Sequence, residues 1–312
     1  MKTGIYLSYT GLGANLLHLS YCHQIARKYG PVTIITLCKN LKDALADDPF
    51  IENVFYLNQY NKKFFDIFQL SRILKKFNFE NLLIYYPSLR IYFAAKFAGI
   101  KNIYSYSFFK KKNLHLINTA KKFTEKFLKT SDCNTEAKFF VKEERIVKVQ
   151  KELNNNSYKI VIGAGSSGPT TRWGAKNFAN LINSLNETGD YFFFILCGPN
   201  EKDVETEIIN NLKKKNFLTL SDKNIYDVIP YICSANMYVG NDSFGSHITS
   251  QTGKKSLVFL LDAPRAYTDY SNNYYRIIPK GYNIDEITHG TNADPNLISV
   301  SEVINVINKF KD

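Results

Sequence analysis

Cysteine is scarce in this sequence, and its spacing carries no pattern. Five cysteines are spread over 312 residues, and no two of them form a CxxC pair. An odd number of scattered cysteines argues against a disulfide framework, and the missing CxxC spacing argues against a zinc site. We therefore expect reduced, structural thiols in a cytoplasmic protein, with no bound metal.

Long apolar runs are absent as well. The chain enters an expected strand at residues 5–8 almost at once, without the apolar core of a signal peptide before it. No stretch approaches the roughly 20 apolar residues that a membrane-spanning helix needs. We therefore expect a cytoplasmic protein, and any contact that it makes with a membrane should be peripheral.

Acidic residues are too few to balance the basic ones. The sequence has 40 Lys and Arg against 28 Asp and Glu, a net charge of +12. Such an excess suits nucleic acid, an anionic membrane surface or a phosphorylated substrate, and it also follows from an AT-rich genome that favours lysine. The sequence contains no recognisable nucleic-acid-binding module, so nucleic acid is not an expected partner.

Strands and helices are expected to alternate through both halves of the chain, without a short-period repeat. In the first half, the strands are expected at residues 5–8, 31–37, 54–56, 82–86 and 103–106, and the helices at 14–29, 64–77 and 91–97. In the second half, the strands are expected at 158–162, 191–196, 217–220, 237–239, 256–261 and 275–278, and the helices at 175–185, 201–215 and 225–232. This alternation is typical of α/β proteins with doubly wound, mostly parallel sheets.

The alternation lapses over residues 107–156, and the polar tract Asn154–Ser157 is the best candidate for a linker. We expect an N-terminal domain at 1–154 and a C-terminal domain at 155–312, two Rossmann-like halves facing each other across a cleft. The closing helix, with its apolar stripe from Val300 to Ile307, is expected in the second domain or packed back on the first.

Lysines mixed with apolar residues fill the stretch 107–129. A basic amphipathic stretch can lie on an anionic membrane or receive a phosphorylated acceptor. It can equally be the solvated face of an ordinary helix, and both interpretations stay open at this point.

Three turns of the second half follow expected strands, where ligands bind in sheets of this kind. The first, Gly163–Trp173, combines small residues and hydroxyls with the fixed charge of Arg172, which suits a phosphate. The second, Cys197–Glu201, places a carboxylate at a helix start, where it can hold a ribose diol or complement the helix dipole. The third, Gly240–His247, leads from a strand into a helix whose N-terminus favours an anion.

These turns resemble the motifs of glycosyltransferase family 9, the heptosyltransferases of lipopolysaccharide core assembly, which have the GT-B fold. That family has a Gly-rich segment ending in a basic residue and Trp-Pro, then a Gly-x-x-Glu-like turn, then Asp-Ser/Thr-Gly-x-x-His and a later glycine. The corresponding stretches here are Gly163–Trp173, Gly198–Glu201, and Asp242–His247 with Gly253. The likeness covers about residues 158–312, and the first half matches mainly in its opening Gly-Leu-Gly turn.

The resemblance implies an inverting transfer of a sugar from a nucleotide-sugar donor, typically ADP-heptose, to a lipid-linked or glycan acceptor. It implies no obligatory metal and no further cofactor. The residues that would bind the donor diphosphate are Ser166, Ser167, Arg172, Asp242, Ser243, Gly245 and His247. Glu201 would hold the ribose. Backbone donors and a guanidinium at this place would stabilise charge on the leaving group.

The sequence departs from the family in three motifs. In the first, Trp173 is followed by Gly174 instead of Pro, and the usual Lys falls at Thr171, which leaves Arg172 as its substitute. Phe244 stands at the glycine of the Asp-Ser-Gly motif, with Gly245 one place later. At the opening turn, the position of the acid that is thought to be the family's general base is Ala14, and Asn15 follows it. Asn15 and His18 are the candidate catalytic residues here. His18 lies one helical turn on, and a carboxylate elsewhere in the first domain is the other source of a base.

The sequence therefore predicts a glycosyltransferase at the cytoplasmic face of a bacterial inner membrane, in peripheral contact with anionic lipid. Two alternatives stay open. A degenerate family member would bind a nucleotide-sugar or glycan without efficient turnover. A nucleotide-sugar epimerase of similar fold would change the donor with no acceptor present.

Overall fold

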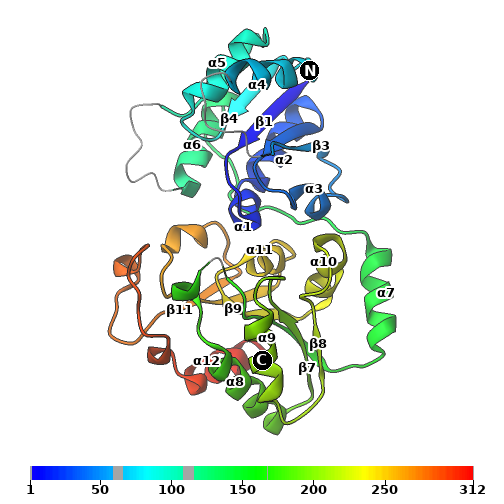
Figure 1. The fold of residues 1–312 in the computed structure, drawn as a ribbon, viewed down its shortest axis with the longest axis vertical. Coiled ribbons are helices and arrows are strands. Elements are labelled where there is room, and N and C mark those ends of the chain that lie inside the picture. Colours follow the sequence, from blue (N-terminus) through cyan, green and yellow to red (C-terminus); the bar gives the residue numbers. More distant parts are fainter. Residues whose placement is uncertain (1, 59–65, 108–115, 167, 312) are drawn as a thin grey trace. The chain divides into compact units, whose positions relative to one another are not determined.

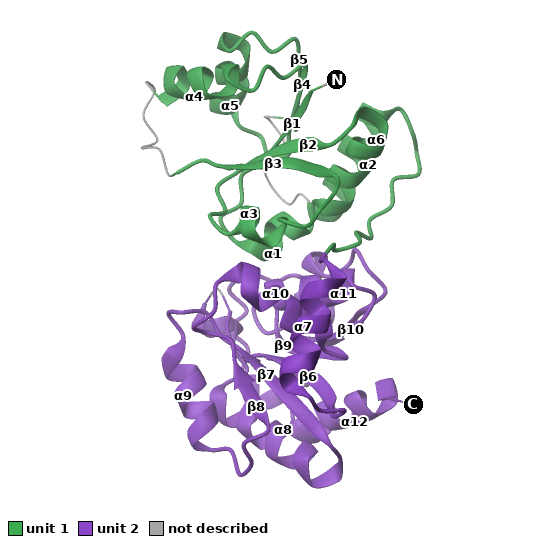
Figure 2. Ribbon diagram, turned by 90° about the vertical axis from the view of Figure 1, so that its right-hand side faces the viewer, with its two compact units in different colours: residues 1–140 green, residues 141–312 purple. Residues whose placement is uncertain are grey.

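The computed structural model describes residues 2–58, 66–107, 116–166 and 168–311, and the chain divides into two compact units, 1–140 and 141–312 (Figures 1 and 2). The boundary comes earlier than the expected one at residue 154. Helix α7 (Glu143–Leu153) belongs to the second unit because it packs on α10 (Ile225–Ser234), where the Tyr231 hydroxyl donates to the Glu152 carboxylate at 3.0 Å. The asparagine tract after α7 therefore lies inside the second unit.

A parallel five-stranded sheet in the order β3-β2-β1-β4-β5 forms the centre of the first unit (Figure 1). Its strands are β1 (Thr3–Leu7), β2 (Val32–Thr36), β3 (Ile51–Tyr56), β4 (Asn81–Ile84) and β5 (Asn102–Ser105). Its helices are α1 (Leu12–Leu16), α2 (Leu19–Tyr29), α3 (Leu41–Ala44), α4 (Asp66–Lys75), α5 (Leu89–Phe97) and α6 (Leu116–Leu128). The inner strands β1, β2 and β4 are buried along their whole length, as expected for parallel strands covered on both faces.

The prediction of a single helix at residues 14–29 is wrong in one respect. The chain forms two helices there, α1 and α2. The Asn15 side chain donates to the carbonyls of Gly11 and Tyr9, at 2.7 and 2.9 Å. Side-chain bonds of this kind compete with the helical ladder. The His18 amide then bonds to the Asn15 carbonyl, three residues back, and the helix breaks at this point.

A parallel six-stranded sheet in the order β11-β10-β9-β6-β7-β8 forms the centre of the second unit. Its strands are β6 (Tyr158–Gly163), β7 (Tyr191–Leu196), β8 (Phe217–Thr219), β9 (Met237–Asn241), β10 (Lys255–Phe259) and β11 (Tyr274–Ile277). Besides α7 and α10 its helices are α8 (Ala175–Thr188), α9 (Lys202–Asn210), α11 (Phe244–Gln251) and α12 (Val300–Lys311). Four short 3₁₀ turns are η1 (Pro169–Thr171), η2 (Arg265–Tyr267), η3 (Ile284–Glu286) and η4 (Pro295–Leu297).

The closing helix α12 packs on α8, within the second unit. Its stripe residues Val303 and Ile307 are fully buried in the same apolar core as Leu181 and Ile182 of α8. Of the two placements expected for this helix, the structure shows the one in the second domain.

Strands β6 and β9 approach closely where they end. A Cβ on Gly240 would lie 2.4 Å from the Gly163 carbonyl oxygen, and a Cβ on Gly163 would lie 1.7 Å from the Tyr238 hydroxyl oxygen. Both distances are too short for real contacts, so only glycine fits at these two positions. The two turns that follow β6 and β9 therefore start from a tightly fixed pair of strand ends.

Across the described ranges, every helix is too short or too polar to span a bilayer.

Candidate functional site

The three turns singled out in the sequence come together at the carboxyl edge of the second sheet. The strand order reverses between β6 and β9, and ligands of open α/β sheets bind at such a switch point. The turn after β6 contacts both of its neighbours. The Gly165 amide donates to the Leu196 carbonyl of β7 at 3.1 Å, and the Asn241 side chain of β9 donates to the Ala164 carbonyl at 2.8 Å. The predicted residue Ser167 lies outside the described residues.

Glu201 fastens these turns to one another. One carboxylate oxygen accepts from the Ser166 amide at 2.9 Å and from the Arg172 guanidinium at 2.7 Å, and the other accepts from the Gly198 amide at 2.7 Å. A carboxylate has about four acceptor sites, so three are filled. A Cβ on Gly165 would lie 2.1 Å from the second oxygen, which explains the glycine there. The expected bond from Glu201 to a ribose stays a prediction, with one acceptor site left for it.

Arg172 has one buried donor without an acceptor among the described residues. Its Nη2 binds Glu201, but its Nε–H is buried and has no hydrogen-bond partner within the described part of the chain. A buried donor that lacks a partner costs about 1–3 kcal/mol. An acceptor oxygen supplied by a bound anion would remove that cost, and a phosphate suits a guanidinium best.

The hydroxyls of the first turn mostly bind the turn itself. Ser166 Oγ donates to the Gly168 carbonyl at 2.9 Å, and the Thr171 hydroxyl lies 2.7 Å from Ser166 Oγ. Thr170 donates to Asp262 at 2.6 Å, and the same carboxylate accepts from the Gly290 amide. The Thr170 hydrogen bond lowers the pKa of Asp262. Sequence reasoning missed Asp262, whose only signal was its place just after strand β10.

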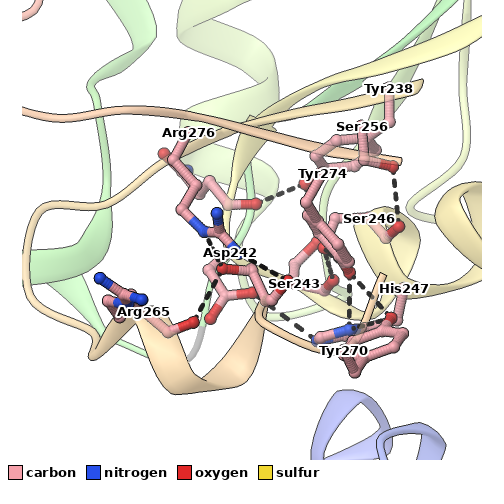
Figure 3. Close-up of polar contacts among 12 residues, drawn as sticks. Tyr238, Asp242, Ser243, Ser246, His247, Ser256, Arg265, Tyr270, Tyr274 and Arg276 are labelled. Carbon is pink, nitrogen blue, oxygen red and sulfur yellow. Dashed lines mark hydrogen bonds and ion pairs between the residues drawn. The ribbon is translucent and has the colours of Figure 1, made fainter. Parts of the chain in front are cut away.

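Asp242 and His247 lie side by side at the start of α11 (Figure 3). His247 Nε2 is 3.6 Å from Asp242 Oδ1, which is within reach of an ion pair but too long for a hydrogen bond. Burial raises the pKa of Asp242 to about 7 and lowers the pKa of His247 to about 3. The imidazole is therefore neutral near pH 7, and burial favours the protonated, uncharged form of the carboxyl group. Asp242 Oδ1 is buried without a hydrogen-bond partner among the described residues.

Two tyrosines fix the orientation of the His247 ring. Its Nδ1 lies 2.9 Å from the Tyr270 hydroxyl and 2.7 Å from the Tyr274 hydroxyl (Figure 3). A neutral imidazole with Nδ1 accepting from a hydroxyl carries its proton on Nε2, which faces Asp242. Both tyrosines were missed in the sequence, because they follow His247 by more than twenty residues and show no motif.

The loop that carries Tyr270 is held by two arginines. Arg276 of β11 donates to Asp269 at 2.9 Å, and Arg265 of η2 donates to the other oxygen of Asp269 at 3.2 Å. Asp269 precedes Tyr270, so this double ion pair positions the tyrosine beside His247.

Ser243 and Gly245 shape the entry to α11. Ser243 Oγ lies 2.9 Å from the Tyr238 hydroxyl, which donates to the Asn241 carbonyl at 2.6 Å. A Cβ on Gly245 would lie 2.5 Å from a methyl carbon of Leu196. Gly245 therefore lets the helix pack closely on β7, and the positive end of the helix dipole lies at this turn.

The contacts of Asn15 are structural, and its catalytic role stays a prediction. Its amide nitrogen donates to two backbone carbonyls, and its oxygen accepts from the Thr36 hydroxyl at 2.8 Å. The residue is 2% exposed. Asn15 ties the ends of β1 and β2 together, and of its hydrogen-bonding groups only one acceptor site of the oxygen is left.

His18 keeps one nitrogen lone pair. Its Nδ1 lies 3.0 Å from the Ala14 carbonyl and donates to it, which leaves the unprotonated Nε2 buried without a partner in the described ranges. The ring stacks on Tyr9 at 5.0 Å and meets the edges of Tyr21 and Tyr85. Burial lowers the pKa of His18 to about 4. Its proton affinity is therefore close to that of an ordinary carboxylate, although the ring carries no charge.

Clusters of three or more His, Cys, Asp or Glu side chains suited to a metal ion do not occur in the described part of the chain. The five cysteines are free and buried.

Comparison with known proteins gives a consistent picture. A model of glycosyltransferase family 9 (heptosyltransferase) matches residues 90–278, which is more than half of the chain. No curated protein sequence matches the chain.

Solved structures match over nearly the whole chain. The E. coli ADP-heptose lps heptosyltransferase II is 14% identical, with 99% of this chain and 98% of that one covered and a TM-score of 0.77. The glycosyl transferase family 9 structure from Veillonella parvula is 15% identical, with 99% and 97% covered and a TM-score of 0.77. The E. coli heptosyltransferase WaaC with ADP is 12% identical, with 99% of both chains covered and a TM-score of 0.72. At such identities the likeness shows the fold, so the predicted α/β fold of GT-B type is confirmed.

Proposed function

The chain belongs to glycosyltransferase family 9, and we propose that it transfers a heptose from ADP-heptose, or a closely similar sugar-nucleotide, to a lipopolysaccharide-core or related glycan acceptor. The reaction inverts the configuration at the anomeric carbon. The enzyme works in the cytoplasm, where a lipid-linked acceptor would bring it to the anionic face of the inner membrane. The observation that carries this proposal is the unpartnered Nε–H of Arg172 at the switch point of the second sheet.

The donor diphosphate fits the carboxyl edge of the second unit. A phosphate oxygen accepts from Arg172 Nε, and the N-terminus of α11 favours the same negative charge. Asp242 in its protonated form donates to a further phosphate oxygen, which removes the cost of its buried, unpartnered Oδ1. Glu201 keeps Arg172 in place and offers its remaining acceptor site to a ribose hydroxyl.

These groups also assist the departure of the nucleotide. As the bond between the anomeric carbon and the phosphate oxygen breaks, negative charge grows on the diphosphate. A fixed guanidinium and a helix N-terminus stabilise that charge without rearranging, because both are already held by the fold. The role of the second unit is therefore electrostatic, and the arrangement needs no group that moves.

The acceptor hydroxyl must lose its proton while its oxygen bonds to the anomeric carbon. We assign the proton to Nε2 of His18, since both N–H groups of Asn15 are bound to backbone carbonyls, its amide oxygen is not a base at neutral pH, and Ala14 replaces the acid of the family. His18 is 1% exposed, with Tyr9 stacked on it, so the tyrosine must swing aside for a hydroxyl to reach the ring. The proton then leaves from imidazolium to solvent when the product departs.

The test is an assay of ADP release from ADP-heptose, with and without a lipopolysaccharide-core acceptor. The proposal expects release only when the acceptor is present, and a glycosylated product in equal amount. Donor that binds without acceptor-dependent release would show a degenerate member that does not turn over, which the alanine at position 14 makes the leading alternative.

An epimerase would behave differently in the same assay. UDP-GlcNAc 2-epimerase from Neisseria meningitidis is 13% identical, with 99% of this chain covered and a TM-score of 0.51. This likeness is lower than that of the heptosyltransferases. Conversion of the donor sugar with no acceptor in the tube would favour this activity and contradict transfer.

A further inference from the structure

Large apolar side chains are exposed in a row on helix α5 of the first unit. Leu89, Phe93 and Phe97 are 53, 44 and 59% exposed, and they follow one another at intervals of four residues. Residues at this spacing lie on one face of a helix. Ile91, Ala94 and Ala95 form the buried face of α5, so the helix is apolar on both sides.

The neighbouring helix α4 extends this apolar row. Phe68 of α4 is 50% exposed, and its ring stacks on Phe97 at 5.6 Å and 15°. The two helices pack along each other, and both views show them side by side (Figures 1 and 2). We name the set Phe68, Leu89, Phe93 and Phe97 the α4–α5 surface.

Positive charge accompanies the α4–α5 surface. On α4, Arg72 and Lys75 follow Phe68 by four and seven residues and share its exposed face, and on α5 Lys96 follows Leu89 by seven. Residues 66–101 contain six Lys and Arg against two Asp and Glu, and one of those acids, Asp66, is within ion-pair distance of Arg90. The surface is thus aromatic at its centre and cationic around it.

The second unit offers a contrast. Among the described residues, its large exposed apolar side chains are Tyr226, Tyr275 and Leu297, which lie on three separate elements, α10, β11 and η4. Tyr226 is covered by the Arg145 guanidinium, 3.6 Å from its ring centre. Single exposed apolar residues of this kind are ordinary, whereas a contiguous patch marks an interaction site.

Helix α6 does not provide an equivalent face. The basic stretch 107–129 was considered for membrane contact, but the apolar residues of α6 point inward. Ile117, Ala120, Phe127 and Leu128 are all at least 92% buried, and α6 packs on α2. Residues 108–115 of that stretch lie outside the described residues.

We propose that the α4–α5 surface is where the protein docks on an anionic lipid bilayer, with its aromatic residues in the headgroup region and its cations over acidic lipid. Aromatic rings suit the boundary between water and acyl chains, and each Lys or Arg near an anionic surface strengthens binding about fivefold. A protein partner would bury rings of this kind but would not require the surrounding excess of one charge. The inference rests on the proposed function in one respect, that a membrane-linked acceptor gives the docking its purpose.

The experiment measures co-sedimentation of the full chain with vesicles of phosphatidylcholine containing phosphatidylglycerol, and with phosphatidylcholine alone. Wild-type protein should bind the anionic vesicles, and added salt should weaken binding because the cations are screened. The double variant Phe93→Ser with Phe97→Ser should bind about tenfold more weakly. Arg72→Glu with Lys96→Glu, which loses two cations at about fivefold each, should bind at least about 25-fold more weakly.

Matched controls lie on the second unit. Tyr275→Ser with Leu297→Ser removes two apolar side chains of similar exposure, and Lys176→Glu with Lys215→Glu reverses two exposed charges. These variants should bind vesicles like the wild type. Unchanged thermal unfolding of all four double variants shows that folding is not the cause.

Three results would overturn the proposal. The first is that the wild-type protein does not sediment with anionic vesicles. The second is that the control variants lose as much binding as the α4–α5 variants. The third is that the wild type binds no vesicles but self-associates, and that the Phe93→Ser with Phe97→Ser variant no longer does. The last would assign the surface to a second copy of the chain. Titration of the same preparations with ADP-heptose separates the two proposals, because donor binding without vesicle binding rejects only the docking. Vesicle binding without donor binding rejects only the proposed function.

Discussion

Counted from its own first strand, each sheet of this protein runs in the order third, second, first, fourth, fifth, and the second sheet adds a sixth strand at the end. The turns at the carboxyl edges nevertheless differ in chemistry. In the second unit these turns carry Arg172, Glu201, Asp242 and His247, with buried polar atoms left open. In the first unit they carry amides and hydroxyls bound to one another, and aromatic rings around His18.

Under the proposed function, this difference assigns the donor to the second unit and the proton of the acceptor to the first. A diphosphate needs fixed positive charge and free N–H donors, and the second edge has both. An acceptor sugar needs an uncharged group that takes the proton of its hydroxyl, and rings on which the sugar can stack. The turns of the first unit have the Nε2 lone pair of His18 and the tyrosine rings around it. The predictions below try to break this division, beginning with the largest effect.

His18→Phe should lower the turnover number by about 10²–10⁴-fold, because it removes the proton acceptor while it keeps a ring to stack on Tyr9. The affinity for the donor should not change. The measurement is acceptor-dependent ADP release, with donor affinity measured in parallel. Turnover within threefold of the wild type, in a folded variant, would remove His18 from the reaction.

Glu201→Ala should lower the free energy of unfolding by about 3 kcal/mol, because Arg172 and two backbone amides lose their common acceptor. The side chains of Arg172 and Glu201 are 26 and 11% exposed. Solvent therefore screens the pair, and the loss of stability stays at the lower end of the range for buried ion pairs. The Asn15 side chain links turns of the first unit in a similar way, so Asn15→Ala should also destabilise the protein. Urea unfolding measures both, and donor affinity should fall only in Glu201→Ala. Equal donor affinity in the two variants would contradict the assignment of the donor to the second unit.

Asp242→Asn should change the pH dependence of stability. Burial raises the pKa of Asp242 to about 7, above its ordinary value of 3.8, so the native state holds a proton that the unfolded state releases. This contribution is present at low pH and is lost as the pH rises towards 7. His247 and His18 act in the opposite direction, because burial lowers their pKa values to about 3 and about 4, and stability therefore falls as the pH drops below about 6.5.

The asparagine variant removes only the carboxyl contribution. Relative to the wild type, its stability should rise between about pH 5 and about pH 7, by at most about 1.4 kcal/mol per pH unit, and then level off. Urea unfolding of both proteins across this range provides the check. Parallel curves for the two proteins would show that Asp242 is not protonated in the native state.

Thr170→Val should have the smallest effect, a loss of about 1 kcal/mol in the free energy of unfolding, since it removes one hydrogen bond to Asp262. The pKa of Asp262, which this bond lowers, should rise, and nuclear magnetic resonance titration can follow it. An unchanged pKa would show that the bond from the Gly290 amide is sufficient by itself.

Much of the fold could be predicted from the sequence because buried parallel strands are nearly continuous apolar runs. The strand at 191–196 was predicted at its observed bounds. The split of the first helix could not be predicted, because it depends on the Asn15 amide finding carbonyls at Gly11 and Tyr9. The unit boundary was misplaced for a similar reason, since the polar tract after α7 gives no sign that α7 itself packs forward on α10.

The candidate site was predictable only where its residues follow strand ends. Arg172, Glu201 and Asp242 were found in this way. Tyr270 and Tyr274 contact His247 only through the tertiary fold, and no spacing in the sequence predicts these contacts. The α4–α5 surface was missed because apolar residues four apart usually indicate a buried face, and only the structure shows that Phe93 and Phe97 face outward.

The central claim is that the second unit holds a diphosphate at Arg172, while the first unit supplies the proton acceptor. Calorimetric titration of ADP-heptose into wild-type protein, Arg172→Ala and His18→Phe tests it directly. The account predicts one binding site, weakened about 10–100-fold by Arg172→Ala and unchanged by His18→Phe. Equal affinity in Arg172→Ala and the wild type, or a loss of affinity in His18→Phe alone, would contradict it.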